Sequence, residues 1–400
     1  MSYLFLALSI CAIAYAVVAL ARMLAFRARL EAYEKGRINA LPTLPPITVL
    51  KPVAGLETGL YENLCSFCAQ DYPQFQVVFG IPNPDDPAAA VIADVARAFP
   101  GRAIALVTGR AAPAQNLKVA QLMEMVKSAA HGLLVVADSD TRVEPAYLRA
   151  VATAFANADV GAVTCLYRGA PRSGIASALG ALMIDDQFIP SVLVAAGGGV
   201  RFCLGATMAV TRRALDAIGG FAALSDYLAD DQMLGELVSR AGLRVELAPY
   251  VVEHIVDEPS LRTLWSHELR WARTSRAARP WGYTGYFITF VWPPALVYLL
   301  VAGSTTLALA VLGAAVALRV ASHYASRAGL RARGRDLLWL VPMRDLMGLA
   351  VWACSFFGRG VRWRDRALRI DGQGRIVDSM PERPHASATQ TARDETEARR

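Results

Sequence analysis

An uncharged apolar stretch near the N-terminus limits the folds that this chain can adopt. Residues 3–21 read YLFLALSICAIAYAVVALA and carry no charged side chain. About 20 apolar residues in a helix cross a hydrocarbon core, because lipid offers no partner to free backbone groups. A cleaved signal peptide is the alternative, but no basic segment precedes the stretch and no clear small-residue cleavage site precedes Arg22. We therefore expect a transmembrane anchor and its basic flank over residues 1–30.

Two further apolar zones in the C-terminal third predict membrane segments. The zone at 286–318 is interrupted by a Gly-Ser pair, which predicts a helical hairpin. The zone at 337–357 contains Pro342 and the charged pair Arg344-Asp345. A full span there would place the arginines that follow it outside, against the positive-inside rule. We therefore favour a re-entrant or interfacial segment at 337–357.

Basic residues beside the apolar segments predict the orientation. The first span is preceded by no charge and followed by Arg22, Arg27, Arg29, Lys35 and Arg37. Because cytoplasmic flanks carry the excess of Lys and Arg, we expect the following domain to face the cytoplasm of a bacterial-type inner membrane. The net charge of +7 fits attraction to a lipid bilayer with anionic head groups. No basic-aromatic module typical of nucleic-acid binding is present, so nucleic acid is not an expected partner.

Residues 45–257 alternate between short apolar runs and helical patterns. Strands are expected at 47–51, 76–81, 103–108, 132–137, 160–169, 201–210 and 244–252, and helices at 55–70, 87–99 and 116–129. This alternation is typical of a doubly wound, Rossmann-like α/β domain. The remaining units are an interfacial amphipathic helix at 258–282, the membrane segments at 285–358, and a basic, then disordered tail at 359–400.

Two carboxylates directly follow the strand expected at 132–137. In an open α/β sheet, ligands bind at the carboxyl ends of the strands, so Asp138 lies on that edge and Asp140 can point the same way. Together they can share a Mg²⁺ or Mn²⁺ ion, which prefers oxygen ligands and enters with substrate phosphates. A local Asx turn is the alternative. Because other polar landmarks accompany this pair, we favour the metal site.

Polar residues also follow the neighbouring strands. Asp85 and Asp86 come after 76–81, where a carboxylate could bind the base or ribose of a nucleotide. An aspartate before proline is equally a helix cap, and one residue can cap while the other binds. Lys118 opens the helix after 103–108 and could pair with a phosphate; a solvated lysine is the alternative.

A second acidic pair and a basic-aromatic cluster precede the C-terminal membrane segments. Asp230 and Asp231 lie in a helical pattern, where paired acids are usually exposed. A transfer to a hydroxyl group, however, needs a carboxylate that removes its proton. His267, Arg270 and Trp271 share one helix face by their spacing, which would also suit a basic-aromatic interfacial helix.

The ordered set of motifs resembles that of inverting, membrane-bound glycosyltransferases with a GT-A fold, whose pattern is D, DxD, (E/D)D and (Q/R/H)xxRW. The chain looks like the ceramide glucosyltransferase family and its bacterial relatives, including the hopanoid-biosynthesis glycosyltransferases. The resemblance rests on the opening of the α/β domain and on VVADSDTRVEPAYL, GAVTCLYRG, LADDQMLGE and HELRWARTSR. It covers about residues 45–280 and extends loosely to Trp363-Arg364.

On the donor side, the resemblance implies that Asp86 contacts the nucleotide. From their own positions after the strands, Asp85 and Lys118 are further candidates for the donor site. Asp138 and Asp140 would hold the metal ion and the diphosphate, although the family varies at the position of Asp140.

On the acceptor side, the resemblance implies that Asp231 is the catalytic base, with Asp230 in place of a frequent glutamate. Arg270 and Trp271 would form the RW pair. His267 stands where many relatives have glutamine, so its role is open.

The implied reaction transfers a single hexose from a UDP-sugar to the hydroxyl group of a membrane lipid, ceramide first, with inversion. The same chemistry on a hopanoid with UDP-N-acetylglucosamine is the alternative. A processive polysaccharide synthase shares the motif order but needs more spans for its channel. An inactive membrane scaffold would not need intact acids at every expected place.

Overall fold

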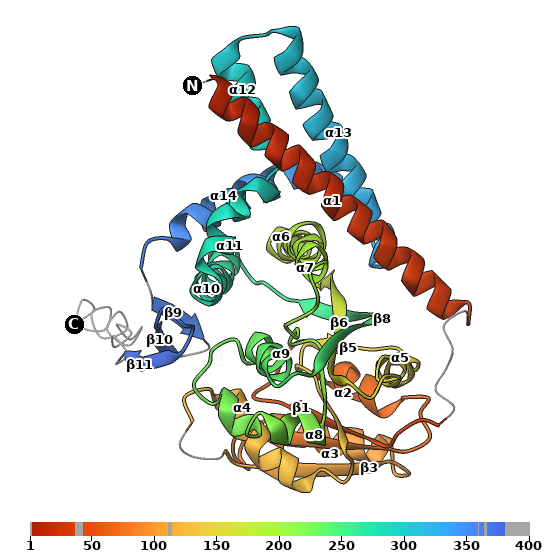
Figure 1. The fold of residues 1–400 in the computed structure, drawn as a ribbon. Helices are drawn as coiled ribbons and strands as arrows, with labels where there is room; N and C mark the ends of the chain where they lie inside the picture. Colours follow the sequence, from red (N-terminus) through yellow and green to blue (C-terminus); the bar gives the residue numbers. More distant parts are fainter. Residues whose placement is uncertain (1, 37–42, 111–113, 359, 364–365, 381–400) are drawn as a thin grey trace, which may run out of the picture.

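The computed structural model describes residues 2–36, 43–110, 114–358, 360–363 and 366–380. The disorder expected at the C-terminal end falls mainly on 381–400, which lie outside the described residues. Figure 1 shows an α/β domain at one end, a bundle of long helices at the other, and a layer of shorter helices between them.

An eight-stranded mixed sheet is the scaffold of the α/β domain, in the order β3-β2-β1-β4-β7-β6-β8-β5. Its strands are β1 (Ile47–Pro52), β2 (Phe75–Ile81), β3 (Ala103–Thr108), β4 (Leu133–Val136), β5 (Thr141–Arg142), β6 (Val160–Pro171), β7 (Met208–Thr211) and β8 (Arg244–Val256). β3, β2, β1 and β4 are parallel, and β7 is antiparallel to both of its neighbours. The carboxyl ends of the four parallel strands therefore lie along one edge.

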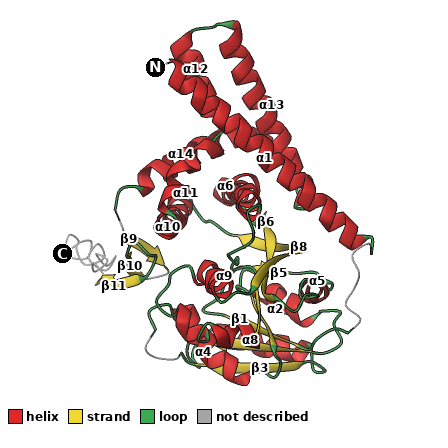
Figure 2. Ribbon diagram, viewed as in Figure 1, coloured by secondary structure: helices red, strands yellow, loops and turns green. Residues whose placement is uncertain are grey.

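Helices cover both faces of this sheet (Figure 2). They are α2 (Leu60–Cys68), α3 (Ala88–Ala98) and α5 (Tyr147–Thr153) on one face, and α4 (Leu117–Met125), α8 (Arg212–Ala217) and α9 (Asp230–Arg240) on the other. Successive residues of a strand point to opposite faces, so Val49 joins the first core and Leu50 the second. This two-sided burial confirms the doubly wound α/β class.

The differences from the expected strands lie in the second half of the domain. The four parallel strands begin and end within one residue of their expected bounds. The strand expected at 201–210 was wrong in its first part, since only Met208–Thr211 form β7. The chain before it turns so that the carbonyl group of Gly205 accepts a hydrogen bond from the backbone of Asp138. A helical segment was also missed: α6 (Gly174–Met183), the π-helical turn η2 (Ile184–Phe188) and α7 (Ile189–Ala196).

The helical bundle contains the N-terminal helix and the expected hairpin. Its members are α1 (Ser2–Glu34), α12 (Trp292–Ala302) and α13 (Thr306–Gly329), which pack against one another. Among the described residues, three helical segments are long and apolar enough to cross a membrane: α1, α13 and the segment Gly174–Ala196. A fourth candidate joins Pro280–Thr289 to α12 through a bend of 65°.

The segment expected at 337–357 forms the helix α14 (Val341–Ser355), preceded by the 3-10 turn η5 (Leu338–Leu340). Its 15 residues extend roughly 22 Å, less than the roughly 30 Å of a hydrocarbon core. It packs against α10 (Leu261–Ala278), the amphipathic helix that the sequence predicted. A re-entrant or interfacial position of α14 stays a prediction.

A small second sheet follows α14. Its strands are β9 (Gly360–Trp363), β10 (Arg366–Ile370) and β11 (Ile376–Met380), antiparallel in the order β11-β10-β9. Leu368, Ile370 and Ile376 bury their side chains against Leu228, just before α9. The first part of the expected basic tail is therefore folded, because alternating apolar residues give it a face to bury.

Candidate active site

Three of the predicted residues meet in one ion-pair cluster at the carboxyl edge of the parallel strands. Asp138 follows β4 closely, and its Oδ1 lies 2.7 Å from Lys118 Nζ. The same ammonium group lies 3.1 Å from Asp230 Oδ2, at the start of α9. Burial raises the pKa of Asp138, although the positive charge of Lys118 opposes this shift. Residues far apart in sequence thus share one site.

The start of α4 positions Lys118. Asn116 Oδ1 accepts hydrogen bonds from the backbone N–H groups of Lys118 and Val119, at 3.0 and 3.1 Å, as a helix cap does. The side-chain amide of Asn116 donates to the carbonyl group of Tyr227, at 2.8 Å. The Lys118 side chain is only 16% exposed, so it is not the solvated lysine of the alternative interpretation.

Asp140 pairs with His254, which the sequence analysis missed. The pairing of β5 with β8 brings Thr141 opposite His254 and places His254 Nδ1 3.4 Å from Asp140 Oδ1. That oxygen is buried and accepts no hydrogen bond. Burial raises the pKa of Asp140, but His254, Lys51 and His267 together outweigh this effect, and the pKa falls to about 2. No sequence signal marked His254, since this contact depends on the pairing of two distant strands.

Lys51 was also missed, although its place at the carboxyl end of β1 is a signal for a site residue. Its side chain is fully buried, and Nζ donates to the carbonyl oxygen of Asp138 at 2.6 Å and to Thr141 Oγ1 at 3.1 Å. The ammonium group lies 3.7 Å from the centre of the Phe67 ring. Burial lowers the pKa of Lys51 to about 7. Lys51 therefore holds the turn that carries both predicted metal ligands.

Asp231 is half-buried beside this cluster. Its Oδ1 accepts a hydrogen bond of 2.7 Å from the backbone N–H of Gln232. Burial raises the pKa of Asp231 to about 6; the neighbouring charge of Asp230 adds to this shift, and Lys118 opposes it. A Cβ atom on Gly205 would lie 2.4 Å from Asp138 Oδ2 and 3.6 Å from Asp231 Oδ2. The backbone of Gly205 thus lies close to both carboxylates, where a larger residue would not fit.

The helix α10 carries the predicted basic-aromatic cluster toward these acids. Ser260 and Thr263 form a capping box that starts the helix. His267 Nδ1 lies 2.8 Å from Glu258 Oε1, and its ring packs edge-on against Trp271 with 4.5 Å between centroids. Sequence reasoning missed Glu258.

Arg270 lies in the field of the acids. Burial lowers the pKa of Arg270 to about 10. The negative charges of Glu258, Asp138, Asp140 and Asp231 act in the opposite direction and raise this pKa. The purely interfacial interpretation of α10 is therefore incomplete, because Arg270 lies within electrostatic range of the acidic cluster.

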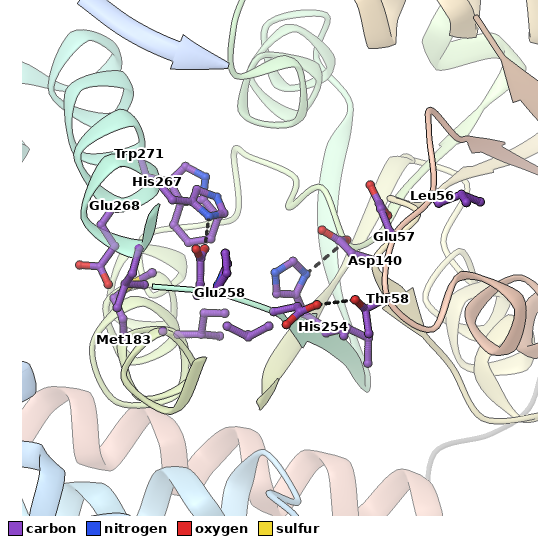
Figure 3. Close-up of a pocket in the computed structure, with 17 residues that line it drawn as sticks. Leu56, Glu57, Thr58, Asp140, Met183, His254, Glu258, His267, Glu268 and Trp271 are labelled. Carbon is purple, nitrogen blue, oxygen red and sulfur yellow. Dashed lines mark hydrogen bonds and ion pairs between the residues drawn. The ribbon is translucent and has the colours of Figure 1, made fainter. Parts of the chain in front are cut away.

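A cavity of about 470 Å³ connects α10 with the edge of the sheet (Figure 3). His254, Asp140 and Glu57 line it on one side, and His267 and Trp271 on the other. The wall between them is largely apolar and includes Met183, Ile184, Val256 and Leu264. The cavity thus carries polar side chains on both sides and apolar side chains between them, a mixture that suits an amphiphilic molecule.

The first acidic pair plays a structural part here. Both oxygens of Asp86 accept from the backbone N–H of Gly55, at 3.0 and 3.1 Å, and Oδ1 also accepts from Ala88 at the start of α3. The predicted capping role is therefore present at Asp86, whereas Asp85 is exposed. A contact of either residue with a nucleotide stays a prediction.

Asp138 and Asp140 are the residues that could hold a divalent metal ion. The part of the chain that the structure describes contains no cluster of three His, Cys, Asp or Glu side chains arranged as metal ligands. Water and substrate phosphates would therefore complete the coordination, as is common for Mg²⁺. Asp140 Oδ1 has His254 Nδ1 3.4 Å away as its ion-pair partner and accepts no shorter hydrogen bond, so it could also be a ligand of such an ion.

Comparisons with known proteins support the family resemblance. The model of glycosyl transferase family 21 matches residues 4–376. Ceramide glucosyltransferases 1 and 3 of Caenorhabditis elegans are 24% and 23% identical over 245 and 241 residues. These matches cover 61% and 60% of this chain, and it spans only 53% and 52% of the length of the two relatives. The resemblance drawn from the motifs is thereby confirmed.

One solved structure supports the fold. The mannosyltransferase PcManGT from Pyrobaculum calidifontis, in complex with GDP-Man and Mn²⁺, superimposes with a TM-score of 0.50 at 18% identity. The similarity covers 88% of this chain and 99% of that chain. It confirms the GT-A-type α/β domain, and the apolar helices add the features of a membrane protein.

Proposed function

Since the chain belongs to glycosyl transferase family 21, we propose that it transfers a single hexose from a UDP-sugar to the hydroxyl group of a membrane lipid, with ceramide as the acceptor. One observation carries this proposal: a cavity lined by Asp140, His267 and Trp271 has an apolar wall, and the charge of Arg270 interacts with the nearby charges of Asp138 and Asp231. The names of the two nematode relatives favour ceramide over other lipids.

The donor would lie along the carboxyl edge of the parallel strands. Asp138 and Asp140 would hold a Mg²⁺ or Mn²⁺ ion, which supplies positive charge to the diphosphate. PcManGT was solved with Mn²⁺, which supports testing both ions. Lys118 is close enough to Asp138 to reach the same phosphates, and Asp86 would contact the nucleotide.

The acceptor would enter the cavity with its hydroxyl group toward the acids. Asp231 takes the proton of that hydroxyl group, and the oxygen forms its bond to the anomeric carbon while the bond to the diphosphate breaks. Attack opposite the leaving group inverts the configuration. Arg270 stabilises the charge on the departing diphosphate. Asp231 suits the role of base, because a pKa of about 6 leaves it ionised at neutral pH yet more basic than an ordinary aspartate.

The apolar wall of the cavity supports a lipid acceptor. Met183 and Ile184 belong to the helical segment Gly174–Ala196, which is itself apolar enough to enter a bilayer. Trp271 lies on the same cavity wall as His267 and can pack beside the acceptor. The basic residues after α1 support a cytoplasmic site, where nucleotide sugars are made.

The experiment incubates membranes carrying the protein with Mn²⁺ or Mg²⁺ and a panel of UDP-sugars, with ceramide and hopanoid acceptors in parallel. Mass spectrometry reads the lipid products, and membranes carrying the Asp231→Asn variant are the control. A ceramide with one added hexose supports the proposal. A sugar added to the hopanoid alone would mean that the acceptor is a hopanoid and not ceramide. A soluble polymer or no product would contradict the proposed function.

A further inference from the structure

Two adjacent charged residues of α14 are buried and point to different partners. Arg344 is 0% exposed and Asp345 is 1% exposed. Their partners lie on separate elements, α10 for Arg344 and the α12–α13 hairpin for Asp345. The sequence shows these residues only as an interruption of an apolar stretch, which leaves their purpose unexplained.

Arg344 binds the catalytic helix with fixed geometry. Its two terminal nitrogens donate to the two carboxylate oxygens of Glu268, at 2.5 and 2.8 Å. Such a two-bond pair of guanidinium and carboxylate fixes orientation as well as distance. Glu268 lies next to His267 and two residues before Arg270, and it lines the cavity. The ion pair therefore lies within the basic-aromatic cluster of His267, Arg270 and Trp271.

Asp345 binds both helices of the hairpin. Its oxygens accept from Arg319 Nε and Nη2, each at 2.9 Å, and Oδ2 also accepts from the indole N–H of Trp292, at 2.9 Å. Arg319 donates onward to Asp186 Oδ2 at 3.1 Å. Asp186 lies in η2, whose Ile184 lines the same cavity. A chain of buried charges thus joins the membrane helices to two walls of the cavity.

Little of the helix α10 itself is buried. Of its 18 residues, only Leu264 and Glu268 are buried. Leu264 packs in a small cluster with Leu179 and Leu182 of α6 and with Leu340 and Val341 at the start of α14. Arg273 and Arg276, farther along α10, donate to backbone carbonyl groups that follow α14, including that of Gly358. Other elements also contact α10, among them α6 and η2, whose Phe188 ring lies 6.4 Å from that of Trp271, but α14 is the element that binds it through a buried ion pair.

Stability alone does not account for this arrangement. Replacing a buried ion pair by apolar side chains is often neutral or stabilising, so a buried pair is weak support for a stabilising role. What the pair supplies is a defined geometry between two helices. We propose that α14 fixes the position of α10 and that Arg344 is the positioning residue. Through its ion pair with Glu268, Arg344 keeps Arg270 and Trp271 of α10 at the reaction centre. This inference rests on the proposed function for its catalytic consequence only.

The test compares Arg344→Met, Arg344→Lys and Glu268→Gln with the parent protein and with Arg240→Gln. Arg344→Met keeps an unbranched apolar stem but removes the guanidinium group, and Arg344→Lys keeps the charge but cannot form two parallel bonds. Arg240 pairs with Glu236 on the exposed face of α9 and is the matched control. Hydrogen exchange of the purified protein in detergent is measured over 261–278 and over 230–240.

We expect the hydrogen-exchange rate over 261–278 to rise at least about tenfold in Arg344→Met, Arg344→Lys and Glu268→Gln, while the rate over 230–240 stays the same. In Arg240→Gln, both regions should exchange as in the parent protein. Transfer should lose about 10²-fold in kcat while the UDP-sugar affinity stays within about threefold, since an error near 1 Å in position is enough for such a loss. Arg344→Lys should lie between the parent and Arg344→Met.

Two results would overturn the proposal. One is unchanged exchange over 261–278 in Arg344→Met. The other is a uniform rise across all peptides, which would mean that the pair stabilises the whole fold without positioning α10. If Arg344→Met does not fold, Arg344→Lys and Glu268→Gln decide by the same criterion. A parent protein without transferase activity would contradict the proposed function. The exchange measurement would then still decide whether α14 positions α10.

Discussion

Lys118 and Asp138 form an ion pair with 2.7 Å between Lys118 Nζ and Asp138 Oδ1. The same lysine also pairs with Asp230, so one ammonium group stands between the predicted metal ligand and the acids of α9. A divalent ion on Asp138 would use the side chain that now holds Lys118. The lysine and the metal are therefore competitors at Asp138, and metal binding would leave Lys118 available to a phosphate.

Removing this competitor should tighten metal binding. We expect Lys118→Met to bind Mn²⁺ about tenfold more tightly at pH 8 without nucleotide, because a positive charge a few ångströms away is lost. The same variant should bind the UDP-sugar more weakly if Lys118 reaches its phosphates. Calorimetric titration measures both affinities, and Lys127→Met, at an exposed lysine just after the end of α4, is the control. An unchanged Mn²⁺ affinity would show that the two cations do not share Asp138.

Asp231 can be tested separately from donor binding. We expect Asp231→Asn to reduce transfer by at least about 10²-fold to 10⁴-fold, since the amide cannot take the acceptor proton. Metal-dependent UDP-sugar binding should stay largely intact, whereas Asp138→Ala should lose it. Product formation and donor affinity are measured for both variants, with Asp216→Asn on the exposed side of α8 as control. Nearly normal turnover in Asp231→Asn would remove it as the base.

The pH dependence of transfer should follow Asp231. The base acts when ionised, so kcat should fall as pH drops through about 6. Because the charge of Asp230 raises the pKa of Asp231, Asp230→Asn should move this acid limb to lower pH. Because Lys118 lowers that pKa, Lys118→Met should move the limb to higher pH. Profiles of kcat at saturating substrate measure both shifts, and shifts in the same direction would contradict the assignment.

The sequence was enough to predict the elements that depend on local patterns. The strands β1 to β4 follow from apolar runs of the right length, and α10 follows from its amphipathic spacing and its Ser260 cap. The position of Asp138 at the sheet edge follows from the strand before it. These features need only neighbouring residues, so one sequence is sufficient to find them.

Contacts between distant segments could not be predicted in the same way. His254 meets Asp140 only because β5 and β8 pair, and Glu268 meets Arg344 only because α14 folds back on α10. The strand expected across 201–210 begins only at 208, because the chain turns at Gly205. The carbonyl group of Gly205 accepts a hydrogen bond from the backbone of Asp138, and no local pattern reveals this contact. The segment 360–380 looked like a tail because its apolar residues are few and its partner, Leu228, lies far away in sequence.

The turn at Gly205 provides the last prediction. A Cβ atom at this position would lie 2.4 Å from Asp138 Oδ2, so Gly205→Ala must displace the carboxylate or the turn. We expect a loss of about 10²-fold in transfer, because a displacement near 1 Å in a catalytic group has that effect. Gly198→Ala is the matched control, since a Cβ there meets no atom within 4 Å. Activity and thermal unfolding are measured together. A large loss of transfer in Gly205→Ala with little change in Tm assigns the effect to the site, whereas equal activity in both variants would show that Asp138 tolerates displacement and does not hold the metal ion.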